Sequence, residues 1–143
     1  MMNEIRGFSG EYRFLSNFWP CSLTFGSWAF TSAEYAYQAA KSNDPEEWRA
    51  IQACSTPGQA KRLGKKLTLR PDWEKVKLEC MHEILTAKFS IPELKDMLLA
   101  TGTAQLVEEN HWGDRYWGVC QGTGHNHLGR LLMQVRDEIG GAQ

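Results

Sequence analysis

Prolines at the expected starts of helices divide the middle of this 143-residue chain into several short helical segments. Asp44-Pro45 and Thr56-Pro57 each place a residue that can cap a helix before a proline at the first helical position. Pro71 opens a longer helix, and Pro92 opens a short one that ends near Thr101-Gly102. Because proline breaks a helix in its interior, these positions predict separate helices rather than one long helix.

Two further helices follow from capping and periodicity. Thr31-Ser32-Ala33-Glu34 fits a capping box that opens a helix ending near Ser42. The final helix extends from about Asn126 to Ile139, and Arg136 on it is expected at the surface. The apolar positions with helical spacing are Leu128, Leu131, Leu132, Val135 and Ile139 in the final helix, and Trp73, Val76, Cys80 and Ile84 after Pro71.

Strand patterns occupy the N-terminal part and one later segment. Residues Cys21 to Phe25 and Trp28 to Phe30 flank Gly26-Ser27, which suits a tight hairpin turn. Gln105 to Glu109 predicts a short strand. The predicted fold class is therefore α+β and helix-rich, a single compact domain (1–143) of several helices with a small N-terminal β-hairpin or sheet.

The composition excludes several classes of protein. Hydrophobic residues make up 42% and charged residues 23%, which is typical of a globular chain. The formal net charge of -1 argues against broad electrostatic coating of nucleic acid, although a local basic patch stays open. No apolar run approaches membrane-spanning length and the N-terminus lacks a signal-peptide pattern, so we expect a cytoplasmic protein that does not contact a membrane.

The cysteines and histidines do not predict a metal site. The four cysteines are widely spread, without a C-x-x-C pair, and we expect reduced core thiols rather than a disulfide or zinc framework. They are Cys21, Cys54, Cys80 and Cys120. We therefore expect no metal and no cofactor.

Glu34 is the first candidate for chemistry. With Tyr37, Gln38 and Lys41 it occupies positions i, i+3, i+4 and i+7 of one predicted helix, so the four side chains share a face. The helix N-terminus favours an ionised carboxylate at this position. The alternative is that Glu34 only caps the helix and Lys41 is solvated.

Asp114 is the second candidate carboxylate. It lies among the rings Trp112, Tyr116 and Trp117, in a connection from Asn110 to His125 that is rich in Gly, Trp and polar residues. The alternative is a loop aspartate that caps a turn. Cleavage of a bond at an anomeric carbon builds positive charge on the sugar, and it requires a base that accepts a proton from the attacking water. Two carboxylates from distant segments could supply these two roles at one site.

Three other segments are expected to contribute residues that bind phosphate and sugar. A basic cluster after Pro57 suits a phosphate site or a solvated helix face: Lys61, Arg62, Lys65, Lys66 and Arg70. Phe14 to Phe18 mixes rings with Ser16 and Asn17, as a pocket for a polar ring compound requires. Asn126 either contributes to that pocket or caps the final helix.

Many blocks of the chain resemble the YbiA-like family, also called the NADAR family. They keep the family's order and cover nearly the whole chain, so the match is strong. The blocks are Phe14-Leu15-Ser16-Asn17-Phe18, Ser32 through Lys41, Ala60 through Gly64, Asp72-Trp73-Glu74, Met81, Lys88-Phe89, Thr101-Gly102, Leu106-Val107-Glu108, Asp114 with Trp117-Gly118, and Asn126 through Arg136.

The resemblance implies a compact, mainly helical fold and N-glycosidase chemistry. Described family substrates are phosphorylated ribosylamino-pyrimidine intermediates of riboflavin synthesis and ADP-ribose groups on guanine bases of nucleic acid. Glu34 matches the family's essential glutamate, and Asp114 matches the aspartate of its Asp-x-x-Trp-Gly block. Only Val119 to His125 separate Trp-Gly from Asn126 here, a compact loop that bears on the pocket rim.

We therefore expect an N-glycoside hydrolase acting on a phosphorylated, ribosylated small molecule. The alternatives are a hydrolase that removes ADP-ribose from guanine in DNA or RNA, and a non-catalytic sensor of NAD or ADP-ribose. The oligomeric state does not follow from the sequence. The expected catalytic residues are Glu34 and Asp114, and the expected substrate-binding residues are Ser16, Asn17, Phe18, Tyr37, Gln38, Lys61, Arg62, Trp112, Tyr116, Trp117, Gly118 and Asn126.

Overall fold

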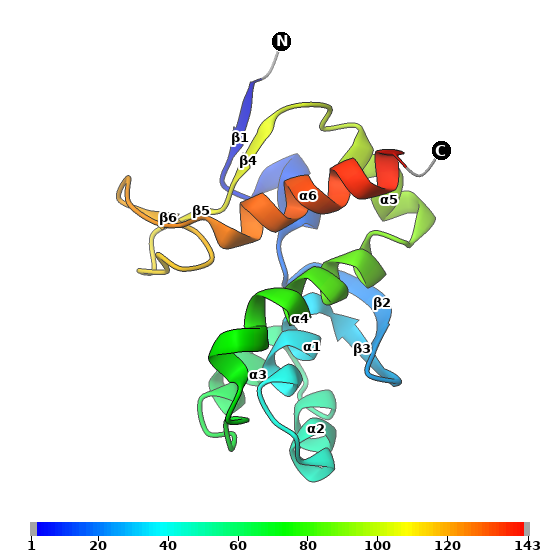
Figure 1. The fold of residues 1–143 in the computed structure, drawn as a ribbon, viewed down its shortest axis with the longest axis vertical. Helices are drawn as coiled ribbons and strands as arrows, with labels where there is room; N and C mark the ends of the chain where they lie inside the picture. The colour runs from blue at the N-terminus through cyan, green and yellow to red at the C-terminus, as the bar shows by residue number, and fades with distance from the viewer. Residues whose placement is uncertain (1–2, 142–143) are drawn as a thin grey trace. The chain divides into compact units, whose positions relative to one another are not determined.

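The computed structural model describes residues 3–141, which form two compact units (Figure 1). The first unit contains the chain up to Ser16 and from Phe89 onward, and the second runs from Asn17 to Lys88. The two units are described separately below. The single-domain organisation stays a prediction, which one cooperative thermal transition of the whole chain would support.

A β-hairpin opens the second unit. Strands β2 (Pro20–Phe25) and β3 (Trp28–Ser32) pair antiparallel, with Leu23 opposite Phe30. Both turn residues have positive φ, 57° at Gly26 and 68° at Ser27, as a two-residue hairpin turn of type I′ requires. The predicted hairpin and the position of its turn are confirmed.

Four helices follow the hairpin, and two of them begin as their prolines predict. Asp44 accepts a hydrogen bond from the Glu46 backbone N–H (2.9 Å), and Thr56 accepts one from Gln59 N–H (3.1 Å). These bonds satisfy backbone donors that have no partner within the helix. The helices are α1 (Ala33–Ala40), α2 (Pro45–Gln52), α3 (Pro57–Gly64) and α4 (Trp73–Lys88).

The capping box predicted at the start of α1 is wrong. Ser32 occupies the N-cap position with extended backbone, but its side chain makes no capping hydrogen bond. Instead, the Glu34 N–H donates to the backbone carbonyl of Asn17 (2.9 Å). A distant main-chain carbonyl thus satisfies this backbone donor, and the Ser32 hydroxyl does not cap the helix.

Small side chains let α1 pack in the core of the second unit. Its alanines are fully buried, and the helix contacts both hairpin strands and the other three helices of this unit. Aromatic packing extends the core on the hairpin side, where Phe25 stacks on Trp48 with ring centroids 5.8 Å apart. The side chains on α1 are therefore held in a densely packed environment.

Within residues 3–141, the first unit contains short parallel strand pairs, a 3₁₀ helix and two α-helices. Strand β1 (Glu4–Arg6) pairs with β4 (Gln105–Val107), and β5 (Glu109–Asn110) pairs with β6 (Val119–Cys120). The strand predicted from Gln105 to Glu109 is thus two short strands. The helices are the 3₁₀ helix η1 (Gly10–Leu15), α5 (Pro92–Leu99) and α6 (His127–Gly141).

Arg136 is buried in α6, which contradicts its predicted surface position. The residue is only 7% exposed, and its Nη1 donates to Thr101 Oγ1 and to the carbonyl of Ala104, both at 2.9 Å. Helix α6 packs on β4 and α5, so the stem of Arg136 lies inside while its charged head bonds to the connecting segment. The apolar pattern alone could not identify these partners.

The cysteines are free thiols, with Cys120 buried and Cys21, Cys54 and Cys80 partly buried. Cys120 therefore lies in the core as predicted, the other three are less buried than predicted, and the reduced state stays a prediction. Within residues 3–141, no helix is long and apolar enough to cross a membrane. In the same part of the chain, no three His, Cys, Asp or Glu side chains are grouped so that they could hold a metal ion.

Candidate functional site

Glu34 is a buried carboxylate on the first turn of α1. It is 7% exposed, and Gln38 one turn later donates its Nε2–H to Glu34 Oε2 at 2.6 Å. Burial of a carboxylate is unfavourable unless hydrogen bonds or charges compensate it. A buried carboxylate held in one orientation by a hydrogen bond is a candidate for chemistry.

Three buried acceptors near α1 have no hydrogen-bond partner. Within the described residues, Asn17 Oδ1, Ser32 Oγ and Gln38 Oε1 are the only buried side-chain nitrogen or oxygen atoms without one. An unsatisfied buried acceptor costs about 1–3 kcal/mol, so its presence requires an explanation. Asn17 and Ser32 are each adjacent to Glu34, through a backbone hydrogen bond or in sequence, and both suit donors on a ligand. Sequence reasoning missed Ser32 because serine before a helix is usually a cap.

Lys41 and two lysines of α3 form a cationic group next to this helix face. Burial lowers the pKa of Lys41, Glu34 raises it, and Lys61 and Lys65 lower it further by repulsion. The Lys41 Nζ lies 5.3 Å from the ring centroid of Tyr37, a cation–π distance. Lys41, for which solvation was the alternative, is therefore partly buried and lies close to two other lysines.

Arg62 points away from the lysine group. Its Nη1 lies close to Gly58, 3.7 Å from where a Cβ would stand, and its charge acts on the Cys54 thiol. Residues 61 and 62 are consecutive on a helix, so their side chains leave in different directions. Of the predicted phosphate ligands, Lys61 adjoins Lys41 and Arg62 does not.

Lys88 is a second buried amine, which sequence reasoning did not select as a site residue. It is fully buried at the end of α4, and burial lowers its pKa to about 7, opposed by the nearby Cys21. A signal was present in the sequence, because Lys88 continues the spacing of Met81, Ile84 and Leu85, which are all fully buried. A lysine at a core position of an amphipathic helix is unusual and marks a candidate functional group.

The second unit also contains a pocket of about 230 Å³ on the side of the hairpin turn. Its walls include Trp28, Trp48 and Arg70, and none of the predicted site residues lines it. Arg70 is already paired with Asp72 at 2.7 Å. This pocket therefore gives no support to the predicted site.

In the first unit, Asp114 organises its own loop. Its Oδ1 accepts hydrogen bonds from the backbone N–H groups of Tyr116 (3.0 Å) and Trp117 (2.9 Å). Asn110, which is 6% exposed, donates to the Asp114 carbonyl and accepts from its N–H. The turn-capping alternative considered from the sequence is thus present, and a catalytic role for Asp114 stays a prediction.

The predicted ring cluster includes a histidine. Tyr116 lies edge-on to Trp117, with ring centroids 4.9 Å apart. The ring centroids of Tyr116 and His127 are 4.5 Å apart. Trp112 stands apart from these contacts and is 57% exposed. Tyr116 and Trp117 are only partly buried, which suits rings that present a face to a ligand.

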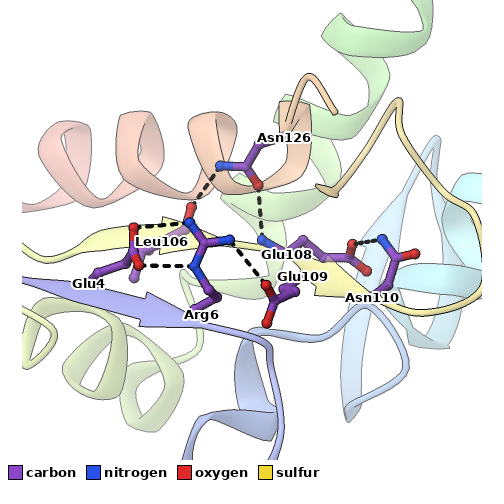
Figure 2. Close-up of polar contacts among 7 residues, drawn as sticks. All are labelled: Glu4, Arg6, Leu106, Glu108, Glu109, Asn110 and Asn126. Carbon is purple, nitrogen blue, oxygen red and sulfur yellow. Dashed lines mark hydrogen bonds and ion pairs between the residues drawn. The ribbon is translucent and has the colours of Figure 1, made fainter. Parts of the chain in front are cut away.

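Asn126 joins the start of α6 to the strand segment beside it, as Figure 2 shows. Its Nδ2 donates to the Leu106 carbonyl and its Oδ1 accepts from the Glu108 N–H, both at 2.9 Å. The residue also has a positive φ of 54°, which asparagine tolerates better than most residues. Both ends of the amide thus bond to the main chain, and contact with substrate stays a prediction.

We expect Asn126→Ala to destabilise the protein by about 2–4 kcal/mol, because two partly buried backbone groups lose their partners and alanine disfavours positive φ. Thermal unfolding checks this. Asn126→Gly is the matched control, since glycine accepts the backbone conformation and removes only the amide. A melting temperature for Asn126→Ala within about 2 °C of the parent would show that the amide does not hold this junction.

The predicted residues divide between the two units. The second unit contains Asn17, Phe18, Glu34, Tyr37, Gln38, Lys61 and Arg62, and the first contains Ser16, Trp112, Asp114, Tyr116, Trp117, Gly118 and Asn126. Within the second unit, the structure brings Asn17, Glu34 and Gln38 together. Cooperation between Glu34 and Asp114 stays a prediction.

Comparison with known proteins gives consistent matches. The NADAR domain family matches residues 6–140. N-glycosidase YbiA of Escherichia coli (strain K12) is 39% identical over 137 residues, covering 92% of this chain and 84% of that protein. A riboflavin biosynthesis protein of Vibrio vulnificus is 38% identical over 133 residues, covering 90% of this chain and 36% of that protein.

The solved structures give the same result for the fold. The NMR structure of the Escherichia coli protein YbiA matches with a TM-score of 0.87 and 34% identity, covering 99% of this chain and 88% of that one. The predicted family and the helix-rich α+β fold class are confirmed.

Proposed function

The chain belongs to the NADAR family, and we propose that it is an N-glycosidase that hydrolyses the bond between a nitrogen base and a phosphorylated ribose. Relatives named N-glycosidase support the reaction class, and relatives named riboflavin biosynthesis proteins support the substrate. The substrate class we propose is a phosphorylated ribosylamino-pyrimidine of that pathway.

The observation that carries the proposal is the buried Glu34 carboxylate, fixed by Gln38 beside two unsatisfied acceptors. When the bond from the anomeric carbon to the base nitrogen breaks, positive charge develops on the ribose ring. A fixed carboxylate stabilises that charge and accepts one proton of the attacking water, whose oxygen bonds to the anomeric carbon. The leaving nitrogen takes a proton from solvent water, and Glu34 then returns its proton to solvent, so that the net reaction adds one water across the bond. Asn17 Oδ1 and Ser32 Oγ accept hydrogen bonds from ribose hydroxyls in this assignment.

The phosphate is assigned to the lysine group of α1 and α3. Like charges held close together raise each other's energy, and an anion among them removes that repulsion. Lys61 and Lys65 act on Lys41 in this way in the structure. We leave Arg62 out of the phosphate site because its guanidinium lies toward Gly58.

Product identification tests the reaction. The purified protein is incubated with a phosphorylated ribosylamino-pyrimidine, and the free base and ribose 5-phosphate are separated by chromatography. Equal amounts of both products, with none from Glu34→Gln, support N-glycosidase activity. Tight binding of the substrate without either product would instead support a sensor.

We expect Lys41→Met and Lys61→Ala each to raise KM for the phosphorylated substrate about 10-fold, because each removes a charge-assisted contact. The same variants should leave KM for the dephosphorylated substrate unchanged. Arg62→Ala is the matched control from the same helix and should change neither value. Equal increases for both substrate forms would show that the lysine group does not bind phosphate.

A further inference from the structure

Gln38 makes a single strong hydrogen bond, and it goes to Glu34. Its Nε2 lies 2.6 Å from Glu34 Oε2, while its Oε1 is buried and has no partner among the described residues. The side chain itself is 3% exposed. A buried amide that satisfies one end and leaves the other unpaired gives little net stability.

The position of the Gln38 amide depends on Gly64 at the end of α3. A Cβ placed at Gly64 would overlap Gln38 Oε1, and it would lie 2.6 Å from Cδ and 3.2 Å from Cγ. Gly64 is not among the glycines with positive φ, so its backbone does not require glycine. The absence of a side chain at residue 64 is therefore explained by the space that Gln38 occupies.

We propose that Gln38 is a positioning residue, held by the backbone of Gly64, that orients the Glu34 carboxylate for the reaction. The inference rests on the proposed function, because it takes Glu34 as the reacting carboxylate. A donor N–H on one carboxylate oxygen restricts the side chain of Glu34 to one orientation. Small errors in such an orientation reduce turnover far more than they reduce binding.

The first test separates positioning from binding and from structure. Gln38→Met keeps the length of the side chain and removes the N–H donor. We expect kcat to fall about 10- to 100-fold, with KM within about two-fold and the melting temperature within about 3 °C of the parent. A raised KM with normal kcat would make Gln38 a substrate ligand, and a large loss of stability with normal kcat would make it a structural residue.

The second test uses the steric contact. Gly64→Ala should lower kcat like Gln38→Met, because the added methyl displaces the amide. Gly58→Ala, on the same helix, should leave kcat unchanged, because a Cβ there meets its nearest atoms at 3.7 and 3.8 Å. In a Gln38→Ala background the space is open, so adding Gly64→Ala should cost no further activity.

These variants are measured together with Glu34→Gln, so that failure of the proposed role of Glu34 can be distinguished from failure of the positioning role of Gln38. If Glu34→Gln retains turnover, the proposed role of Glu34 is wrong whatever residue 38 does. If Glu34→Gln is inactive and Gln38→Met has normal kcat, only the positioning role is wrong. If Gly64→Ala lowers kcat equally with and without the Gln38 side chain, the steric link between residues 38 and 64 is wrong.

Discussion

Glu34→Gln should lower kcat by about 100-fold or more while the protein folds normally. The amide keeps the volume of the carboxylate and can still accept the hydrogen bond from Gln38 Nε2. It carries no negative charge and accepts no proton, so stabilisation of the developing positive charge is lost. Steady-state kinetics on a phosphorylated ribosylamino-pyrimidine, with thermal unfolding of the same preparation, measures both effects.

The structure makes this test cleaner than the sequence alone allows. The Glu34 N–H bonds to the Asn17 carbonyl, so this bond at the start of α1 does not depend on the side chain at residue 34. Glu79→Gln, at an exposed position of α4, is the matched control and should leave kcat unchanged. Turnover of Glu34→Gln within a few-fold of the parent would remove Glu34 from the mechanism.

The effect of Lys88→Met on stability should depend on pH. Burial holds the pKa of Lys88 at about 7 in the folded protein, against about 10.4 for an exposed lysine. Below pH 7 Lys88 is charged in both the folded and the unfolded state. Between pH 7 and about 10 it loses its proton on folding, and the cost of that loss falls as pH rises. The unfolding free energy of the parent should therefore rise across this window, and the difference between Lys88→Met and the parent should shift in favour of methionine as pH falls from 10 to 6, by up to about 4 kcal/mol.

Denaturant unfolding at several pH values, from 6 to 10, measures this difference. Lys75→Met, an exposed lysine on the same helix, is the matched control and should give a small difference that does not vary with pH. A difference between Lys88→Met and the parent that stays constant from pH 6 to 10 would show that folding does not lower the pKa of Lys88.

Local signals in the sequence predicted most of the fold. Asp44-Pro45 and Thr56-Pro57 start helices because a cap and a proline act within one turn, and Gly26-Ser27 forms a hairpin turn because both residues tolerate positive φ. The errors involve partners distant in sequence. The start of α1 is capped by Asn17, and Arg136 is buried because Thr101 and Ala104 accept its hydrogen bonds.

The candidate site was predicted in part for the same reason. Helical spacing placed Glu34, Gln38 and Lys41 on one face, and the structure brings Glu34 and Gln38 into contact. Spacing could not show which of Lys61 and Arg62 lies beside Lys41, or that Gly64 holds the Gln38 amide. Those features depend on how α3 packs against α1, which only the folded chain determines.

The central claim is tested most directly by competition between two substrates in one reaction. Equal concentrations of a phosphorylated ribosylamino-pyrimidine and of DNA with ADP-ribose on guanine are given to the protein. Release of the pyrimidine base from the first and of ADP-ribose from the second is followed with time. The ratio of the initial rates equals the ratio of the two kcat/KM values. The account predicts that the pyrimidine base is released much faster. Faster release of ADP-ribose from guanine, or release of neither product, would contradict it.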